Sequence, residues 1–233
     1  MTAGSADIDS IVSAPGIGDA NLSFTQIMRE RTHDLHTRAE RSGIVNDILR
    51  GKASRYGYAL LLRNLLPAYR RLEAGLDAHR QSPAVSAAAR RELYRAPALA
   101  SDLTEIAGRD WESALPHLAA GEQYERCIAA AAKGDGTRLI AHAYTRYLGD
   151  LNGGQVMKRL LARSPGLRPQ ELSFYDFPQI EETEVFKTHY RCGLDDSAAL
   201  IADIDAVVGE AMTAFELNIA VSEAVQQASA AAV

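Results

Sequence analysis

Apolar residues recur along this chain at the three-to-four-residue spacing of helices, and no segment shows sustained alternation of β-branched residues. Ser23 and Gln26 form a capping-box start, and apolar positions continue at helical spacing to about residue 39. A Leu-rich segment over residues 54–80 has a broad apolar face, and Pro67 inside it should bend or divide that helix. The pattern predicts an all-α fold.

Further helices are predicted over residues 83–94, 98–106, 122–133, 137–162, 182–192 and 197–227. Gly108 and the run Gly134-Asp135-Gly136 end two of them. Residues 1–22 mix Gly, Ser, Ala, Asp and Pro without periodicity and predict a flexible tail, and the Ala-rich residues 228–233 predict a frayed end. We therefore expect a single domain over residues 23–227.

Composition narrows the class of protein. With 233 residues, of which 47% are hydrophobic and 24% charged, the chain can bury a sizeable core. A net charge of −5 argues against a general nucleic-acid binder. The longest apolar run, residues 127–132, is far shorter than the roughly 20 residues of a membrane span. Two cysteines make no disulfide framework in a domain of this size, and we expect a cytoplasmic protein without a membrane anchor.

Three glycines interrupt the predicted helix over residues 137–162. Gly149, Gly153 and Gly154 each disfavour a helix by about 0.5–1 kcal/mol relative to Ala. Gly149 and Gly153 are four residues apart, so they share one face and expose a strip of main chain. Two interpretations remain open: close packing of another helix on the strip, or a bulky planar ligand lying against it. In the second, Asp150 and Arg146 would lie near that ligand.

A histidine on the first helix is a candidate metal ligand. His36 shares a helical face with Met28, Thr32 and Ala39, whereas His33 points about 60° away. A histidine on such a face is more often a core or boundary residue than a ligand. Glu40, four residues on, could accept the second imidazole N–H and leave the other nitrogen for a metal.

Basic residues form a third candidate group. Lys187 and Arg191 are four apart on a late helix, and Arg29 lies near the start of the first. Charges at this spacing usually make a solvated face. If the three converge in space, they could instead bind a dicarboxylate.

Four blocks of the sequence, in this order, resemble the biliverdin-forming heme oxygenases: residues 35–40, 141–155, 186–191 and 213–219. The resemblance covers about residues 24–225. Its most specific part is the run Tyr-Thr-Arg-Tyr-Leu-Gly-Asp-Leu-Asn-Gly-Gly-Gln at residues 144–155.

The resemblance implies a heme held between a proximal helix and a kinked, Gly-rich distal helix. His36 would be the iron ligand with Glu40 as its partner, and Gly149 and Gly153 would lie over the heme. Asp150 would organise distal water and deliver a proton through it. Its implied network partners are Arg146, Tyr69 and Asn218.

The remaining implied heme contacts are distributed along the chain. Arg29, Lys187 and Arg191 match the positions that bind the propionates, and Arg29 keeps the charge of the Lys found there in mammalian proteins. The other implied contacts are Tyr144, Thr145 and Phe215.

The implied activity is oxidative cleavage of heme b, as both cofactor and substrate, at a meso carbon expected to be α. The products would be biliverdin, carbon monoxide and ferrous iron, with O2 as co-substrate. Electrons would come from a ferredoxin, a flavodoxin or an NAD(P)H-dependent reductase. The membrane-anchoring C-terminal segment of animal enzymes has no counterpart here, so we expect a soluble bacterial-type member.

Other classes of protein stay open as alternatives. A non-catalytic heme-binding or heme-trafficking protein would need His36 and the basic anchor but not Asp150. A di-iron carboxylate protein needs two Glu-x-x-His motifs, and only the segment from Glu30 to His33 matches. A purely structural helical module would leave the mid-helix glycines unexplained.

Overall fold

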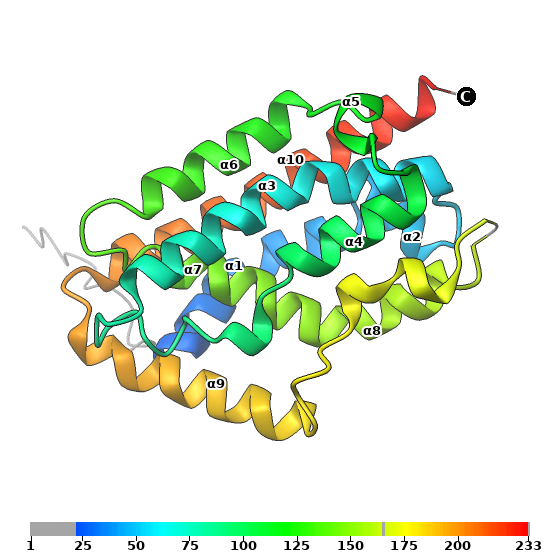
Figure 1. Ribbon diagram of the computed structural model, residues 1–233. Coiled ribbons are helices and arrows are strands. Elements are labelled where there is room, and N and C mark those ends of the chain that lie inside the picture. The colour runs from blue at the N-terminus through cyan, green and yellow to red at the C-terminus, as the bar shows by residue number, and fades with distance from the viewer. Residues whose placement is uncertain (1–21, 165, 233) are drawn as a thin grey trace, which may run out of the picture.

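The computed structural model describes residues 22–164 and 166–232, and every regular element within them is helical (Figure 1). The predicted flexible tail lies outside these residues, apart from residue 22. The α-helices are α1 (Phe24–Glu40), α2 (Gly43–Leu49), α3 (Arg55–His79), α4 (Ala96–Ala107), α5 (Trp111–Ala114), α6 (Ala119–Ala131), α7 (Leu139–Ala143), α8 (Gly149–Leu161), α9 (Thr183–Ser197) and α10 (Ile204–Ala230). A π-helical segment, η2 (Tyr144–Leu148), joins α7 to α8. Short 3-10 turns are η1 (Arg91–Leu93), η3 (Pro169–Glu171), η4 (Ser173–Tyr175) and η5 (Ala198–Leu200).

Helix α3 forms the centre of the fold. Its apolar face and much of its flanks are buried, with Tyr58, Leu62, Leu66 and Leu72 fully inaccessible. Helices α4, α6 and α10 pack along it, and α1 packs on α10 (Figure 1). Helices α1 and α8, which each carry three of the predicted site residues, therefore take their positions from α10 and from the segment before α8.

The predicted all-α, single-domain fold is confirmed, and most predicted helices are present. The capping box at Ser23 and Gln26 begins α1 as expected. Helix α3 runs unbroken through Pro67, so the predicted division is absent from it. The last helix begins at Ile204, because α9 extends to Ser197, and it continues to Ala230, three residues past the predicted end.

The predicted helix over residues 83–94 is wrong. This segment is a series of tight turns followed by η1, with i→i+3 bonds such as Val85 N to Ser82 O at 3.1 Å and Ala88 N to Val85 O at 2.9 Å. Val85 and Ala88 are both fully buried. Successive turns bring apolar side chains inward every third residue, so the sequence pattern imitates a helix. Two short helices, α2 and α5, were not predicted.

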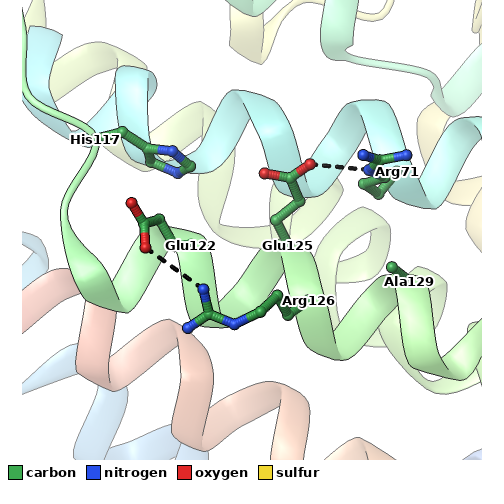
Figure 2. Close-up of a pocket in the computed structure, with 6 residues that line it drawn as sticks. All are labelled: Arg71, His117, Glu122, Glu125, Arg126 and Ala129. Atoms are coloured by element: carbon green, nitrogen blue, oxygen red, sulfur yellow. Dashed lines mark hydrogen bonds and ion pairs between the residues drawn. The ribbon is translucent and has the colours of Figure 1, made fainter.

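The described residues contain no helix that is both long enough and apolar enough to cross a membrane. A hollow of about 360 Å³ lies on the surface between α3 and α6 (Figure 2). Within it Arg71 pairs with Glu125 at 2.8 Å, and Arg126 pairs with Glu122 at 3.4 Å. Its charges therefore largely satisfy one another, and none of its lining residues belongs to the predicted site.

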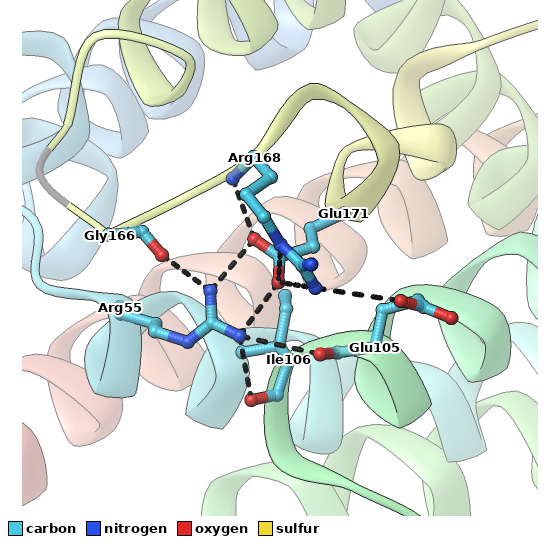
Figure 3. Close-up of polar contacts among 6 residues, drawn as sticks. All are labelled: Arg55, Glu105, Ile106, Gly166, Arg168 and Glu171. Carbon is cyan, nitrogen blue, oxygen red and sulfur yellow. Dashed lines mark hydrogen bonds and ion pairs between the residues drawn. The ribbon is translucent and has the colours of Figure 1, made fainter.

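A buried carboxylate fastens the segment after α8 to α3 and α4 (Figure 3). Arg55 donates to both oxygens of Glu171 at 2.7 Å and to the backbone oxygen of Ile106 at 3.0 Å. Arg168 donates to the same carboxylate at 2.8 Å. Glu171 is fully buried, and the hydrogen bonds from Arg55 lower its pKa to about 2. This cluster fixes the path of the chain between α8 and α9.

Glu171→Gln should destabilise the fold by about 1.5–3 kcal/mol at pH 7, because Arg55 then loses the charge that it was paired with. A carboxyl group with a lowered pKa stabilises the fold only while it is ionised. The contribution is complete above the unfolded pKa near 4.5 and disappears as the pH falls toward about 2. Urea unfolding at pH 7 and pH 3 should therefore give a difference between parent and variant that shrinks at the lower pH.

Glu105→Gln is the matched control for this experiment. Glu105 is half exposed and lies 3.6 Å from Arg168, so its loss should change the free energy of unfolding by less than about 0.5 kcal/mol. Equal losses in the two variants would contradict the importance of the buried pair.

Candidate functional site

Four predicted side chains from four elements meet in one buried hydrogen-bond network. Tyr69 on α3 donates to Asp150 Oδ2 on α8 at 2.5 Å, and Arg146 Nε on η2 donates to the Tyr69 hydroxyl at 2.8 Å. Arg146 also contacts Asp150 Oδ1 at 3.3 Å and donates to Asn218 Oδ1 on α10. The donors run in one direction, from Arg146 through Tyr69 to Asp150. The carboxylate is thus held on one oxygen tightly and on the other loosely.

Burial dominates the electrostatics of this network. It raises the pKa of Asp150, while the charge of Arg146 and the hydrogen bond from Tyr69 act in the opposite direction. Burial also raises the pKa of Tyr69, which keeps the phenol protonated. Burial would lower the pKa of Arg146, but Tyr69 and Asp150 outweigh it and the pKa rises. Of these three groups, Asp150 is therefore the one whose pKa is shifted towards neutrality, whereas those of Tyr69 and Arg146 are shifted away from it.

The helix irregularity that was expected at Gly149 and Gly153 lies instead before them, as a π-helical turn. The irregular residues are Tyr144–Leu148, which precede the glycines, and α8 is a regular α-helix from Gly149 onward. A π turn holds one more residue than an α turn and is frequent at functional sites. Arg146 lies in this turn and Asp150 follows it directly.

The open face of α8 separates the two interpretations of the glycines. A Cβ atom built on Gly149 or on Gly153 would meet no atom of the described residues within 4 Å. A Cβ atom on Gly154 would lie 3.0 Å from Cδ1 of Tyr175. Close packing of Tyr175 on η4 thus explains Gly154 but not the other two glycines. Gly149 and Gly153 leave an exposed, methyl-free strip beside the buried carboxylate of Asp150, as the second interpretation requires.

The histidine predicted as a metal ligand is accessible. His36 lies on α1 with its side chain 57% exposed, and its ring meets the ring of Phe215 on α10 edge-on, with 5.8 Å between centroids. Glu40 Oε1 is 3.8 Å from His36 Nδ1, which is longer than a hydrogen bond. A modest side-chain rotation would close that gap, and the ring can present its other nitrogen to a ligand.

The basic residues divide into two groups. Tyr144 donates to the backbone oxygen of Thr25 at 3.4 Å, and burial raises its pKa while Arg191 and Arg29 lower it. Both guanidinium groups therefore lie near this phenol. Lys187 instead donates to Asn152 on α8 at 2.8 Å and to Glu184 at 2.6 Å, and its side chain is almost fully buried.

One further predicted residue has a polar group without a hydrogen-bond partner among the described residues. Thr145 on η2 is buried, and its hydroxyl has no hydrogen-bond partner among residues 22–164 and 166–232.

The sequence did not reveal two members of the site. Tyr124 on α6 is fully buried and accepts a hydrogen bond from Asn218 at 3.2 Å. Arg95, also buried, is a second cation whose charge lowers the pKa of Asp150. A tyrosine on the apolar face of a helix and an arginine before Ala96 carry no sequence signal that distinguishes them from core and surface residues.

The comparisons with known proteins agree with one another. The sequence model of the family described as "Heme oxygenase" matches residues 22–224. The chain is 33% identical to Heme oxygenase 1 of Pongo abelii over 207 residues, which cover 88% of this chain and 72% of the relative. It is 36% identical to Heme oxygenase 1 of Nostoc sp. over 192 residues, covering 82% of this chain and 81% of that protein.

The fold is likewise similar to that of a solved heme oxygenase. The crystal structure of heme oxygenase-1 from the cyanobacterium Synechocystis sp. in complex with heme matches with a TM-score of 0.85 at 30% identity. That match covers 91% of this chain and 96% of the solved one.

Gly149→Ala and Gly153→Ala should each stabilise the isolated chain by about 0.5–1 kcal/mol, because Ala favours a helix and its methyl group meets no neighbour. Gly154→Ala should show no such gain, since its methyl group would press on Tyr175. Thermal unfolding of the three variants measures this. Destabilisation at Gly149 or Gly153 would mean that the strip is already packed.

Proposed function

Because the chain belongs to the heme oxygenase family and is an enzyme that degrades heme to biliverdin, we propose that heme lies between α1 and α8. The observation that carries this placement is the methyl-free strip of Gly149 and Gly153 directly beside the buried carboxylate of Asp150. A heme oxygenase needs a surface that approaches a flat ring closely and a proton donor at its edge. The strip and the carboxylate supply these from adjacent residues of one helix.

Bound heme supplies an iron that activates O2 and a porphyrin ring that is opened at one meso carbon, giving biliverdin, carbon monoxide and ferrous iron. His36 would bind the iron through one imidazole nitrogen. Glu40 would accept the N–H of the other and so fix the tautomer. Phe215 packs edge-on against the imidazole ring of His36 and limits the rotation of that imidazole.

On the other side, Asp150 would order a water molecule and move a proton through it. Tyr69 occupies Oδ2 at 2.5 Å, whereas Oδ1 has only the long contact with Arg146, so Oδ1 has the free capacity to accept from water. Arg146 in turn is held by Asn218, which is held by Tyr124. These residues orient the carboxylate, and Asp150 acts on the water.

For the propionates we propose an anchor of Arg29, Arg191 and Tyr144, with Lys187 joining when its exposed partner Glu184 is displaced. Each charge-assisted contact is worth about 1.5–3 kcal/mol, enough to favour one seating of heme over another roughly tenfold or more. We expect this seating to direct oxidation to the α-meso carbon.

The reaction consumes O2 and electrons, and we propose a ferredoxin, a flavodoxin or an NAD(P)H-dependent reductase as the donor. We also propose a cytoplasmic location, with which the two unpaired cysteines Cys127 and Cys192 are compatible.

His36→Ala should lose the axial ligand and with it the turnover of heme. His33→Ala is the matched control, because His33 is the nearest other histidine on α1 and lies on a different part of the helix. The measurement is a heme titration followed through the Soret band for both variants. Loss of the ligand in His33→Ala with retention in His36→Ala would show that the assignment is wrong.

Asp150→Ala and Asp150→Asn should bind heme nearly as tightly as the parent, since His36 and the basic anchor are unchanged. Biliverdin formation should fall by about 10²–10⁴-fold, the usual contribution of a positioned proton donor. Heme titration combined with single-turnover spectra under reductant and O2 measures both quantities. Normal biliverdin yield from either variant would remove the proposed role, and loss of heme binding would show instead that Asp150 is a structural residue.

The parent should form mainly the α isomer of biliverdin, and Arg191→Ala should lower the α share by weakening the anchor. Chromatography of the extracted pigment decides between the isomers. A parent that forms mainly the β or δ isomer would show that the propionates bind elsewhere.

A further inference from the structure

We propose that Asp195 is a positioning residue that fixes the start of α1 against α9 and thereby helps to select the meso carbon that is oxidised. This inference rests on the proposed propionate anchor of Arg29, Tyr144 and Arg191. Asp195 contacts none of the reacting atoms in this proposal. It acts on the spacing of the two arginines.

Asp195 holds the first turn of α1 with both carboxylate oxygens. The backbone N–H of Thr25 donates to Oδ1 at 2.7 Å, and the Thr25 hydroxyl donates to Oδ2 at 3.2 Å. The first turn of α1 contains no acidic residue of its own. Asp195 therefore supplies, from a helix 170 residues away in sequence, the negative charge that stabilises a helix N-terminus.

The contact lies one helical turn from each arginine. Arg29 follows Thr25 by four residues on α1, and Arg191 precedes Asp195 by four residues on α9. Figure 1 shows α1 beginning beside the later part of α9, and the two helices are in contact. Asp195 and Thr25 thus set the separation of the two stretches of backbone that carry Arg29 and Arg191.

Tyr144 joins the same assembly from a third element. Its hydroxyl donates to the backbone oxygen of Thr25, and its pKa responds to Arg191, Arg29 and Asp195 together. Thr25 is buried under these contacts. The three charged groups Arg29, Arg191 and Asp195 therefore act on one phenol beside the first turn of α1.

The negative charge of Asp195 favours a positioning role for this residue over direct binding of the propionates. A carboxylate beside an anion-binding site repels the propionates, so its presence lowers the affinity for heme. The contacts that Asp195 does make there are its two hydrogen bonds to Thr25. The four meso carbons of heme are chemically similar, so their selection depends on how firmly the propionates are held in one place.

The experiment compares Asp195→Ala with Asp195→Asn, with Asp196→Ala as the matched control on the adjacent exposed position. Two quantities are measured: amide hydrogen exchange of residues 23–30 in the heme-free protein, and the ratio of biliverdin isomers. Asp195→Ala should exchange faster and shift the isomer ratio about fivefold, equivalent to about 1 kcal/mol. Asp195→Asn keeps an oxygen for the Thr25 N–H, so both quantities should return toward those of the parent, with heme bound at least as tightly. Asp196→Ala should match the parent.

Faster exchange in Asp195→Ala with an unchanged isomer ratio would overturn the proposal, because the residue would then only stabilise the helix. If Asp195→Ala does not fold, Thr25→Val removes the 3.2 Å contact alone and should shift the ratio less, in the same direction. An unchanged ratio there overturns the proposal as well. Arg191→Ala is measured in the same series. If Arg191→Ala leaves the ratio unchanged, the anchor itself fails and this inference fails with it. If Arg191→Ala shifts the ratio and Asp195→Ala does not, only the inference fails.

Discussion

A carboxylate enclosed among helices is the constraint on which this structure depends. Asp150 is only 6% exposed, and an ionised group that is removed from water must be paired and hydrogen-bonded. Its partners come from separate elements, Tyr69 from α3 and Arg146 from η2, while Asn218 on α10 holds the arginine. The requirement to satisfy one charge therefore fixes the relative positions of the helices that form the distal side of the site. The carboxylate that we propose as the proton donor is therefore also a structural link between these helices.

The exposed main chain beside this carboxylate, in contrast, lowers the stability of the fold. Two glycines in a regular helix, with no neighbour that requires them, give up about 1–2 kcal/mol of stability that alanines would supply. Proteins retain such costs where activity needs them. The neighbouring Gly154, pressed on Tyr175, shows that the same residue type in the same helix can be kept for packing alone.

The sequence predicted those parts of the site that lie close together on one helix. Arg146 and Asp150, and Gly149 and Gly153, are each four residues apart, so their shared faces follow from helical periodicity. Tyr69 and Asn218 are 77 and 72 residues away from Arg146, and only the resemblance to a family indicated them. No periodicity encodes contacts between distant helices.

Two other differences have local causes. Lys187 shares a helix with Arg191 at the predicted spacing, but its flexible side chain reaches Asn152 on α8, and spacing alone does not determine where a long side chain ends. The segment before α4 was predicted as a helix because buried turns around Val85 and Ala88 repeat every third residue. Turns and helices differ in which backbone groups are hydrogen-bonded. The spacing of apolar residues along a sequence does not reveal those bonds.

The π turn at Tyr144–Leu148 makes the site dependent on chain length at one point. An α-helix advances by about 100° per residue, so removal of one residue from this turn would rotate everything after it by that angle. Asp150 would leave Tyr69, and the glycine strip would face a different neighbour. Substitutions in this segment alter individual contacts, whereas a single-residue deletion would separate Asp150, the proposed proton donor, from its hydrogen-bond partners, even in a chain that still folds as a helical bundle. Insertions and deletions should therefore be much rarer among functional relatives here than in the loops that connect the other helices.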